Sequence, residues 1–137
     1  MERREMEERA KILIIDDDPD FVQATKKVLE SKPYEVIVAY NGEEGLQKTR
    51  DENPDLILLD IIMPLTDGFT VCEEIKGDPE FDDIPVLMLT SFSQRVGETT
   101  LSVSRGFSLE AEDYIDKPVK PAELLARVEK QLRKKRK

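Results

Sequence analysis

The stretch KILIIDDDPDF, residues 11–21, runs from a mainly aliphatic segment directly into three consecutive aspartates. Two carboxylates about 4 Å apart repel each other by roughly 4 kcal/mol at an effective dielectric constant near 20. We therefore expect a positive group close to Asp16, Asp17 and Asp18. Taken alone, the triplet also fits a loop and a helix N-cap, where the helix dipole favours acidic side chains.

Further short apolar runs follow along the chain, and segments with helical character separate them. These runs are EVIVA (35–39), DLILLD (55–60), IPVLMLT (84–90) and, more weakly, DYID (113–116). Continuous apolarity is typical of strands that are buried on both faces, as in a parallel sheet. Repeated strand–helix alternation predicts an α/β fold, a doubly wound five-stranded parallel sheet with helices on both faces.

The helices between these strands differ in how clearly the sequence predicts them. The first is expected to begin at Pro19, a residue type preferred at the first helical position. Its predicted apolar face comprises Phe21, Ala24, Val28 and Leu29. The segment after Asn41 is a poorer helix former, because Gly45 interrupts it. Cys72 lies on the apolar face of a third helix and is interpreted as a core residue, not as a thiol nucleophile.

The length of 137 residues fits one domain. We expect a charged N-terminal extension over residues 1–10, the domain over residues 11–133 and a basic C-terminal tail over residues 134–137. The single cysteine excludes an internal disulfide, and no apolar run approaches the ~20 residues that a membrane-spanning helix needs. With no apparent signal peptide, these features predict a cytoplasmic protein without a membrane partner.

The charge balance is acidic, with 30 acidic and 21 basic residues and a net charge of -9. Such a surface does not attract nucleic acid, so no direct nucleic-acid binding is expected. The chain contains no histidine. This excludes imidazole bases, histidine metal ligands and Ser-His or Cys-His nucleophile pairs. Chemistry must therefore come from carboxylates, hydroxyls, lysine or a bound metal.

Polar residues follow several of the predicted strands, and ligands of doubly wound sheets bind at the carboxyl ends of the strands. Asp16 and Asp17 end the first strand, Asp60 the third and Thr90 the fourth, and Lys117 follows the fifth. Crowded oxygen ligands suit a hard cation such as Mg²⁺. Asp60 is then a candidate nucleophile that forms an acyl phosphate, while Thr90 and Lys117 hold the phosphoryl oxygens.

Four segments, ILIIDDDPDF, PDLILLDIIMPLTDGF, IPVLMLTS and AEDYIDKPVKPAELLARV, together resemble the receiver domain of the two-component response-regulator family. They span residues 11–130, and the family has a flavodoxin-like fold. The resemblance implies that Asp60 is the phosphoacceptor and that Asp16 and Asp17 bind Mg²⁺. It also implies that the backbone carbonyl of Ile62 completes the protein ligands of the metal.

Other roles also come from this resemblance. It implies that Thr90 and Lys117 contact the phosphoryl group and that Tyr114 occupies an aromatic switch position. Without the family, Tyr114 would be interpreted as a packing residue. Asp18 is implied to be a helix cap and not a metal ligand, and the bond between Lys117 and Pro118 is expected to be cis.

The implied function is a signalling switch. Asp60 would receive a phosphoryl group from a histidine kinase or a histidine phosphotransfer protein in a Mg²⁺-dependent reaction. The domain would then change its affinity for a downstream partner, with a phosphorylation-dependent homodimer as one option. It would not be an enzyme beyond promoting its own phosphorylation and dephosphorylation.

Two alternatives stay open at this point. The first is a Mg²⁺-dependent phosphohydrolase that uses an aspartyl-phosphate intermediate. It would need a leaving-group pocket and a base for water, and the sequence shows neither. The second is a pseudo-receiver that binds a partner without being phosphorylated. Its expected loss of an acid or of the lysine is not seen.

Residues 91–108 depart from the family pattern. The segment between Thr90 and Lys117 is longer than usual and rich in serine and threonine, with glycines at 97 and 106. Such a composition has low helix propensity. We therefore expect residues 91–108 to be the mobile part of the chain and to become ordered on phosphorylation or partner binding.

Overall fold

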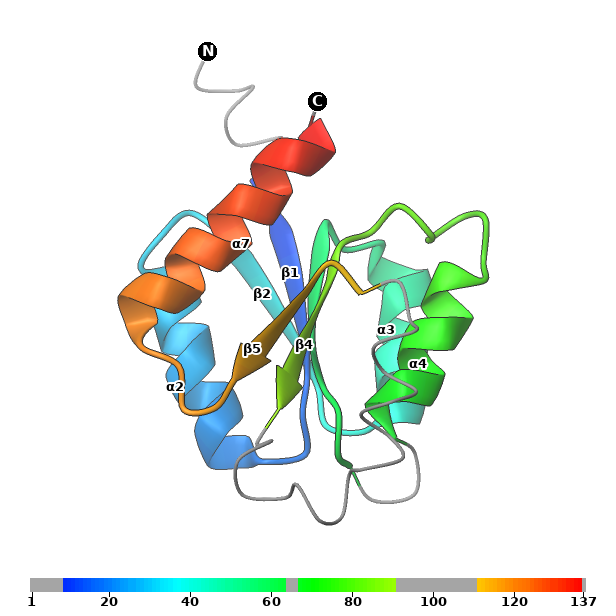
Figure 1. Ribbon diagram of the computed structural model, residues 1–137, viewed down its shortest axis with the longest axis horizontal. Helices are drawn as coiled ribbons and strands as arrows, with labels where there is room; N and C mark the ends of the chain where they lie inside the picture. Colours follow the sequence, from blue (N-terminus) through cyan, green and yellow to red (C-terminus); the bar gives the residue numbers. More distant parts are fainter. Residues whose placement is uncertain (1–8, 64–66, 91–110, 137) are drawn as a thin grey trace.

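The computed structural model describes residues 9–63, 67–90 and 111–136. Five parallel strands form one sheet in the order β2-β1-β3-β4-β5 (Figure 1). They are β1 (Lys11–Ile15), β2 (Glu35–Ala39), β3 (Leu56–Asp60), β4 (Val86–Thr90) and β5 (Asp113–Asp116). The predicted parallel sheet is confirmed. Its strand order reverses between β1 and β3, where doubly wound sheets bind ligands.

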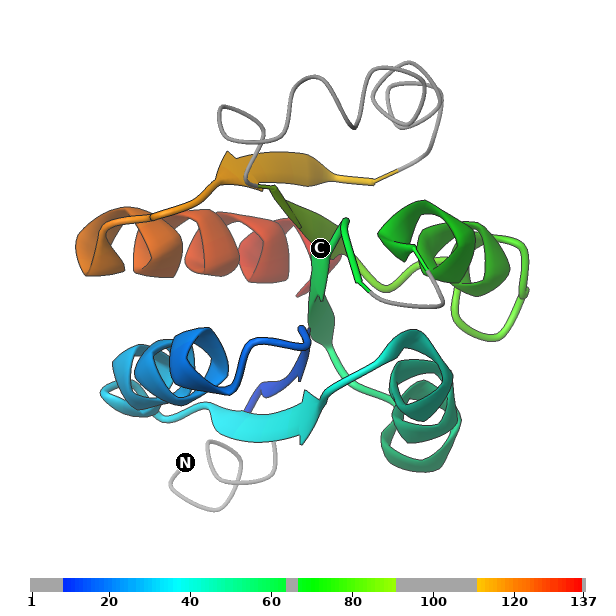
Figure 2. The same cartoon turned by 90° about the horizontal axis from the view of Figure 1, so that it is seen from below.

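Helices cover both faces of the sheet. In the described ranges these are α2 (Pro19–Glu30), α3 (Gly42–Glu52), α4 (Gly68–Lys76) and α7 (Pro121–Arg136). Figure 2 shows α2 and α7 on one face and α3 and α4 on the other. Each face has its own apolar core, and β1 contributes Leu13 and Ile15 to one and Ile12 and Ile14 to the other. Cys72 is buried in the α4 side of the core, as predicted.

The buried face of α2 differs from the predicted one. The helix buries Val22, Thr25 and Leu29. Ala24 is exposed, and Phe21 and Val28 are only half-buried, because they lie at the edges of this stripe. The buried stripe is therefore shifted by about one residue position around the helix from the predicted one.

Gly45 allows α3 to lie close to β1. A Cβ atom at this position would lie 2.5 Å from Cδ1 of Ile15, a fully buried side chain. The cap at Asn41, whose side chain accepts a hydrogen bond from the Glu44 N–H at 2.8 Å, fixes the start of the helix. The residue that weakens helix propensity is therefore the one that permits this packing.

We expect Gly45→Ala to lower the free energy of unfolding by roughly 1–3 kcal/mol, because the added methyl group overpacks the core. Adding Ile15→Val removes the nearest atom and should recover part of the loss. The interaction free energy between positions 15 and 45 is measured by urea denaturation of the wild type, both single variants and the double variant. Strictly additive losses would contradict this explanation.

The amino end of β4 is fixed by an ion pair between the largely buried side chain of Lys76 and the partly exposed side chain of Glu112. Lys76 Nζ donates to the Ile84 carbonyl at 2.8 Å and to Glu112 Oε2 at 2.9 Å. The other carboxylate oxygen of Glu112 accepts from the Val86 N–H at 2.7 Å, and the Glu112 N–H donates to the Val86 carbonyl at 2.9 Å. This network, Lys76–Glu112–Val86, ties β4 to both α4 and the residue before β5.

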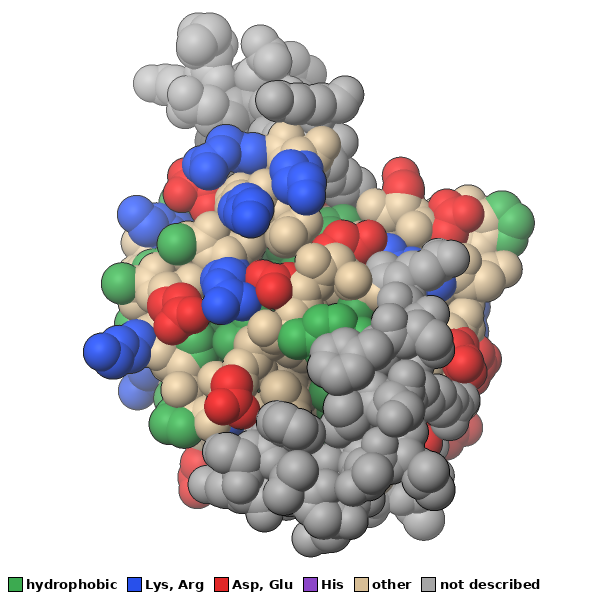
Figure 3. Space-filling model, in the orientation of Figure 1, with side chains coloured by type: hydrophobic (Ala, Val, Ile, Leu, Met, Phe, Trp, Pro, Cys, Tyr) green, Lys and Arg blue, Asp and Glu red, His purple; other side chains and the backbone are tan. Residues whose placement is uncertain are grey.

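The last helix continues to Arg136, past the domain boundary expected at residue 133. Lysine and arginine side chains gather near its C-terminal part (Figure 3), among them the exposed Lys130, Arg133 and Lys134. Cations are favoured there by the helix dipole. Among the described residues, no helix has the length and apolar character needed to cross a membrane. Residues 91–108, expected to be mobile, lie outside the described part.

Candidate functional site

Three carboxylates meet where the strand order reverses. Asp16 and Asp17 follow β1 directly, and Asp60 ends the adjacent strand β3. One oxygen from each of the three lies within 4.8 Å of the others. Asp16 and Asp60 are buried, whereas Asp17 is exposed. The acids that the sequence placed at separate strand ends therefore form one cluster.

Asp16 is held in place by backbone contacts. Its N–H donates to the Ala39 carbonyl at 3.1 Å, which continues the β1–β2 pairing beyond the strand. One of its carboxylate oxygens, Oδ1, accepts from the Asp18 N–H at 3.0 Å. The second oxygen, Oδ2, faces Lys117. The side chain of Asp16 is thus oriented by the first turn of the following loop.

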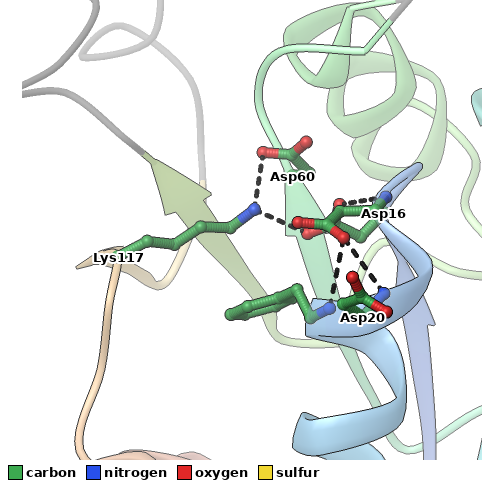
Figure 4. A network of polar contacts seen from close by, with 6 residues as sticks. Asp16, Asp20, Asp60 and Lys117 are labelled. Atoms are coloured by element: carbon green, nitrogen blue, oxygen red, sulfur yellow. Dashed lines mark hydrogen bonds and ion pairs between the residues drawn. The ribbon is translucent and has the colours of Figure 1, made fainter.

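Lys117 supplies positive charge to this cluster. Its Nζ lies 2.8 Å from Asp16 Oδ2 and 3.6 Å from Asp60 Oδ1. Figure 4 shows the lysine extending from the end of β5 toward both carboxylates. The Lys117 N–H donates to the Thr90 carbonyl at 2.6 Å. The bond to Pro118 is cis, as expected.

The environment of Asp60 opposes its ionisation. Burial is the largest cause that raises the pKa of this carboxyl from 3.8 to about 7, and the charge of Asp16 raises it further. Lys117 lowers the pKa, Asp17 raises it, and a hydrogen bond from the Ile62 backbone lowers it. A net excess of negative charge therefore remains beside a carboxylate that has only partial access to water.

The acid cluster can bind a metal ion. Its donors are oxygen atoms only, which suits a hard cation, and a cation there would offset the repulsion between Asp16, Asp17 and Asp60. Lys117 alone does not offset that repulsion, because the charge of Asp16 raises the pKa of Asp60 more than the charge of Lys117 lowers it.

The other predicted site residues lie at or near the ends of β3, β4 and β5. Thr90 is half-buried at the end of β4, in register with Asp116 of β5. Ile62 follows Asp60 by two positions and is half-buried. Tyr114 is paired with Met88 and so lies farther from the strand ends. It is half-buried against the core on the α4 side, and burial and the nearby Cys72 raise the pKa of its hydroxyl.

Sequence reasoning missed two residues that contact this site. The ring of Phe21 lies beside the Lys117 ammonium, with 4.2 Å between Nζ and the ring centroid. Its position in the first turn of a helix that follows a strand end was the available signal. The second is Gly68, whose N–H donates to the Ile61 carbonyl at 2.7 Å. A Cβ at Gly68 would lie 2.3 Å from the Asp60 backbone oxygen.

Comparison with known proteins identifies the class of this site. Residues 12–129 match the family model described as the response regulator receiver domain. The chain belongs to the response-regulator receiver-domain family. This receiver domain therefore has the fold and the signalling role that the sequence resemblance implied.

Individual relatives agree with this assignment. The receiver domain is 42% identical over 124 residues to the DNA-binding dual master transcriptional regulator RpaA of Synechocystis sp., covering 90% of this chain and 49% of that protein. It thus spans about half the length of the curated relatives it matches.

Solved structures give the same result. A putative response regulator from Chloroflexus aurantiacus has a TM-score of 0.79 and 34% identity, covering 91% of this chain and 98% of that one. The signal receiver domain of a signal transduction histidine kinase from Syntrophus aciditrophicus has a TM-score of 0.81 and 33% identity, covering 90% and 89%. Receiver domains thus occur both in regulators and in kinases.

The prediction that excluded nucleic acid as a direct partner is wrong. RpaA, a relative, is named a DNA-binding regulator. The net charge of -9 belongs to 137 residues, which correspond to about half of such a relative. Because electrostatic attraction to DNA depends on where basic groups gather, the net charge of a receiver domain does not describe the protein that carries it.

Proposed function

We propose that Asp60 is the phosphoacceptor of this receiver domain. In this proposal Asp16, Asp17 and the backbone carbonyl of Ile62 hold Mg²⁺, and Thr90 and Lys117 contact the transferred phosphoryl group. The observation that carries it is the position of the Lys117 ammonium, 2.8 Å from Asp16 Oδ2 and 3.6 Å from Asp60 Oδ1. A phosphoryl group on Asp60 would lie within reach of the same ammonium.

The chemistry follows from the side chains present. An ionised Asp60 oxygen attacks phosphorus, the O–P bond forms, and the bond between phosphorus and the donor atom breaks. Lys117 stabilises the negative charge on the phosphoryl oxygens throughout. A bound Mg²⁺ supplies further positive charge to these oxygens and favours the ionised form of Asp60. The pKa of Asp60, raised to about 7, supports a role for a cation near neutral pH, because a cation beside the carboxyl would favour its ionised form.

The proposed signal is a change in local charge. Phosphorylation adds nearly two negative charges and three strong acceptors beside the end of β4. The Thr90 hydroxyl is then drawn toward the phosphoryl group, and Tyr114 on the adjacent strand adjusts its packing against the core. The domain acts as a switch that promotes only its own phosphorylation and dephosphorylation, not as an enzyme with separate substrates.

We propose the donor of the phosphoryl group and the output of the switch from the family to which the chain belongs. A histidine kinase or a histidine phosphotransfer protein is the proposed donor of the phosphoryl group. The transcriptional role in the name of RpaA supports an output on transcription. In this proposal phosphorylation of the receiver domain controls the DNA contact of a transcriptional regulator.

We expect acetyl phosphate to label Asp60 once, and only when Mg²⁺ is present. Intact-mass measurement of the wild type, with and without a chelator, detects the phosphoryl adduct. The Asp60→Asn variant should stay unlabelled, because an amide does not form an acyl phosphate. Asp116→Asn, which alters an exposed acid at the same edge of the sheet, is the matched control and should be labelled normally. Labelling that persists in Asp60→Asn would contradict the assignment.

A further inference from the structure

Phe21 places its ring next to the charged end of Lys117. The distance of 4.2 Å between Nζ and the ring centroid is well within the ~6 Å range of a cation–π interaction. The lysine side chain is only 15% exposed, so water competes little for the ammonium. Desolvation strengthens such an interaction. The contact is therefore more than incidental packing at a surface.

The ring differs in kind from the other partners of the ammonium. Asp16 and Asp60 attract Lys117 through full negative charges, at 2.8 Å and 3.6 Å. Asp16 is also a candidate metal ligand, and its attraction for the lysine falls when its charge is shared with a cation. The face of an aromatic ring carries no net charge and does not bind Mg²⁺. It keeps its attraction for the ammonium whether or not the acid cluster holds a metal.

Asp18, the third of the three consecutive aspartates, fixes the backbone of Phe21. Asp18 Oδ1 accepts hydrogen bonds from the Asp20 N–H at 3.0 Å and from the Phe21 N–H at 3.3 Å. This cap defines the first turn of α2, where Phe21 is the third residue. The direction of the ring toward Lys117 thus depends on the start of the helix.

We propose that Phe21 is a positioning residue, whose ring face holds the Lys117 ammonium beside Asp60 when the acid cluster binds a metal. This inference rests on the proposed function, because it assigns the ring a role in phosphorylation of Asp60. Asp18 contributes indirectly, through the backbone of Phe21.

Nuclear magnetic resonance tests the contact without any phosphorylation. Protons held over an aromatic face are shifted upfield, so the ε-methylene protons of Lys117 should be shifted in the wild type, with and without Mg²⁺. Phe21→Tyr keeps the ring and should keep the shift. Phe21→Leu keeps apolar volume without the ring and should abolish the shift. The signal of the Lys117 ε-methylene protons is identified as the one that is missing from the spectrum of Lys117→Arg.

Phosphorylation kinetics test the consequence. At saturating Mg²⁺, the rate of labelling by acetyl phosphate should fall about three- to tenfold in Phe21→Leu, a loss in keeping with a partly desolvated cation–π contact. It should stay near the wild-type value in Phe21→Tyr. Val28→Ala is the matched control, since Val28 is half-buried on the same helix and packs against the same core. In a Lys117→Met background, Phe21→Leu should cause no further loss.

The outcomes separate the two proposals. A wild type that takes up no phosphoryl group on Asp60 would overturn the proposed function and this inference together. Normal labelling of the wild type with an equal rate in Phe21→Leu would overturn only the inference, as would unshifted Lys117 protons in the wild type. If Phe21→Leu does not fold, Asp18→Ala replaces it. Loss of the cap should then reduce both the shift and the rate, and Asp18→Ser, which restores a cap, should recover them.

Discussion

Asp60→Asn is expected to be more stable than the wild-type receiver domain at pH 8, by roughly 2–4 kcal/mol in the absence of divalent metal. In the folded protein the pKa of Asp60 rises from 3.8 to about 7, chiefly because the carboxyl is buried next to Asp16. The folded state therefore ionises Asp60 at a cost that the unfolded chain does not have. An asparagine of similar size is free of that cost.

The pH dependence has a defined sign. Below about pH 4 the carboxyl is protonated in both folded and unfolded chains, so the two proteins should be similarly stable. Between pH 4 and pH 7 the unfolded chain releases its proton first, and the wild type loses stability relative to the variant as the pH rises. Above the folded pKa of about 7 the difference is complete and constant. Urea denaturation with a chelator at pH 4 and at pH 8 measures both limits.

Two controls make this result specific. Asp116→Asn, an exposed acid at the same edge of the sheet, should change stability by less than about 0.5 kcal/mol at either pH. Addition of Mg²⁺ should stabilise the wild type more than Asp60→Asn, because a bound cation removes the cause of the penalty. A stability difference that is the same at pH 4 and pH 8 would contradict the explanation.

Gly68→Ala is expected to destabilise the domain by roughly 2–4 kcal/mol and to slow phosphorylation of Asp60 strongly. The added Cβ would lie 2.3 Å from the Asp60 backbone oxygen and 2.8 Å from the Ile61 Cα. Both are backbone atoms, so no side-chain rotation relieves the overlap. Either α4 moves outward, and the 2.7 Å hydrogen bond from Gly68 to Ile61 is lost, or β3 shifts and carries the phosphoacceptor with it.

Gly77→Ala is the matched control at the other end of α4. There a new Cβ would lie 3.1 Å from the nearest atom, the Glu73 carbonyl oxygen, and the backbone has an ordinary helical conformation. We expect a change below about 1 kcal/mol and an unaltered labelling rate. Urea denaturation and acetyl phosphate labelling of both variants compare the two positions. Equal behaviour of Gly68→Ala and Gly77→Ala would refute the role of close packing at Gly68.

The strands and the acid cluster could be predicted because the sequence patterns that indicate them are local and strong. Continuous apolar runs gave β1, β2 and β5 at their observed bounds, and β3 and β4 begin slightly later than expected. β3 starts after Asp55, whose carboxylate accepts from the Lys11 N–H at 2.8 Å. Because parallel strands end at one edge of the sheet, the approach of Asp16, Asp60 and Lys117 followed from topology.

Features that depend on how elements approach each other in space were not predictable. The predicted face of α2 included Ala24, which is exposed, because helical spacing alone does not distinguish the centre of a buried stripe from its edge. The same ambiguity concealed the contact of Phe21 with Lys117. The role of Gly68 depends on a backbone approach between α4 and β3 that no residue pattern encodes.

The Lys76–Glu112–Val86 network anchors β4 at its amino end and, within the described residues, leaves the end at Thr90 without such an anchor. Both backbone polar groups of Val86 are bonded to Glu112, which is itself held by Lys76, so this end of the strand cannot slide along its neighbour. Thr90, four residues farther on, is about 13 Å from that anchor. A displacement at Thr90 that leaves this anchor in place bends β4, and its amplitude grows toward Thr90. Because the Lys117 N–H is bonded to the Thr90 carbonyl, the same deflection carries the start of the loop that bears the lysine.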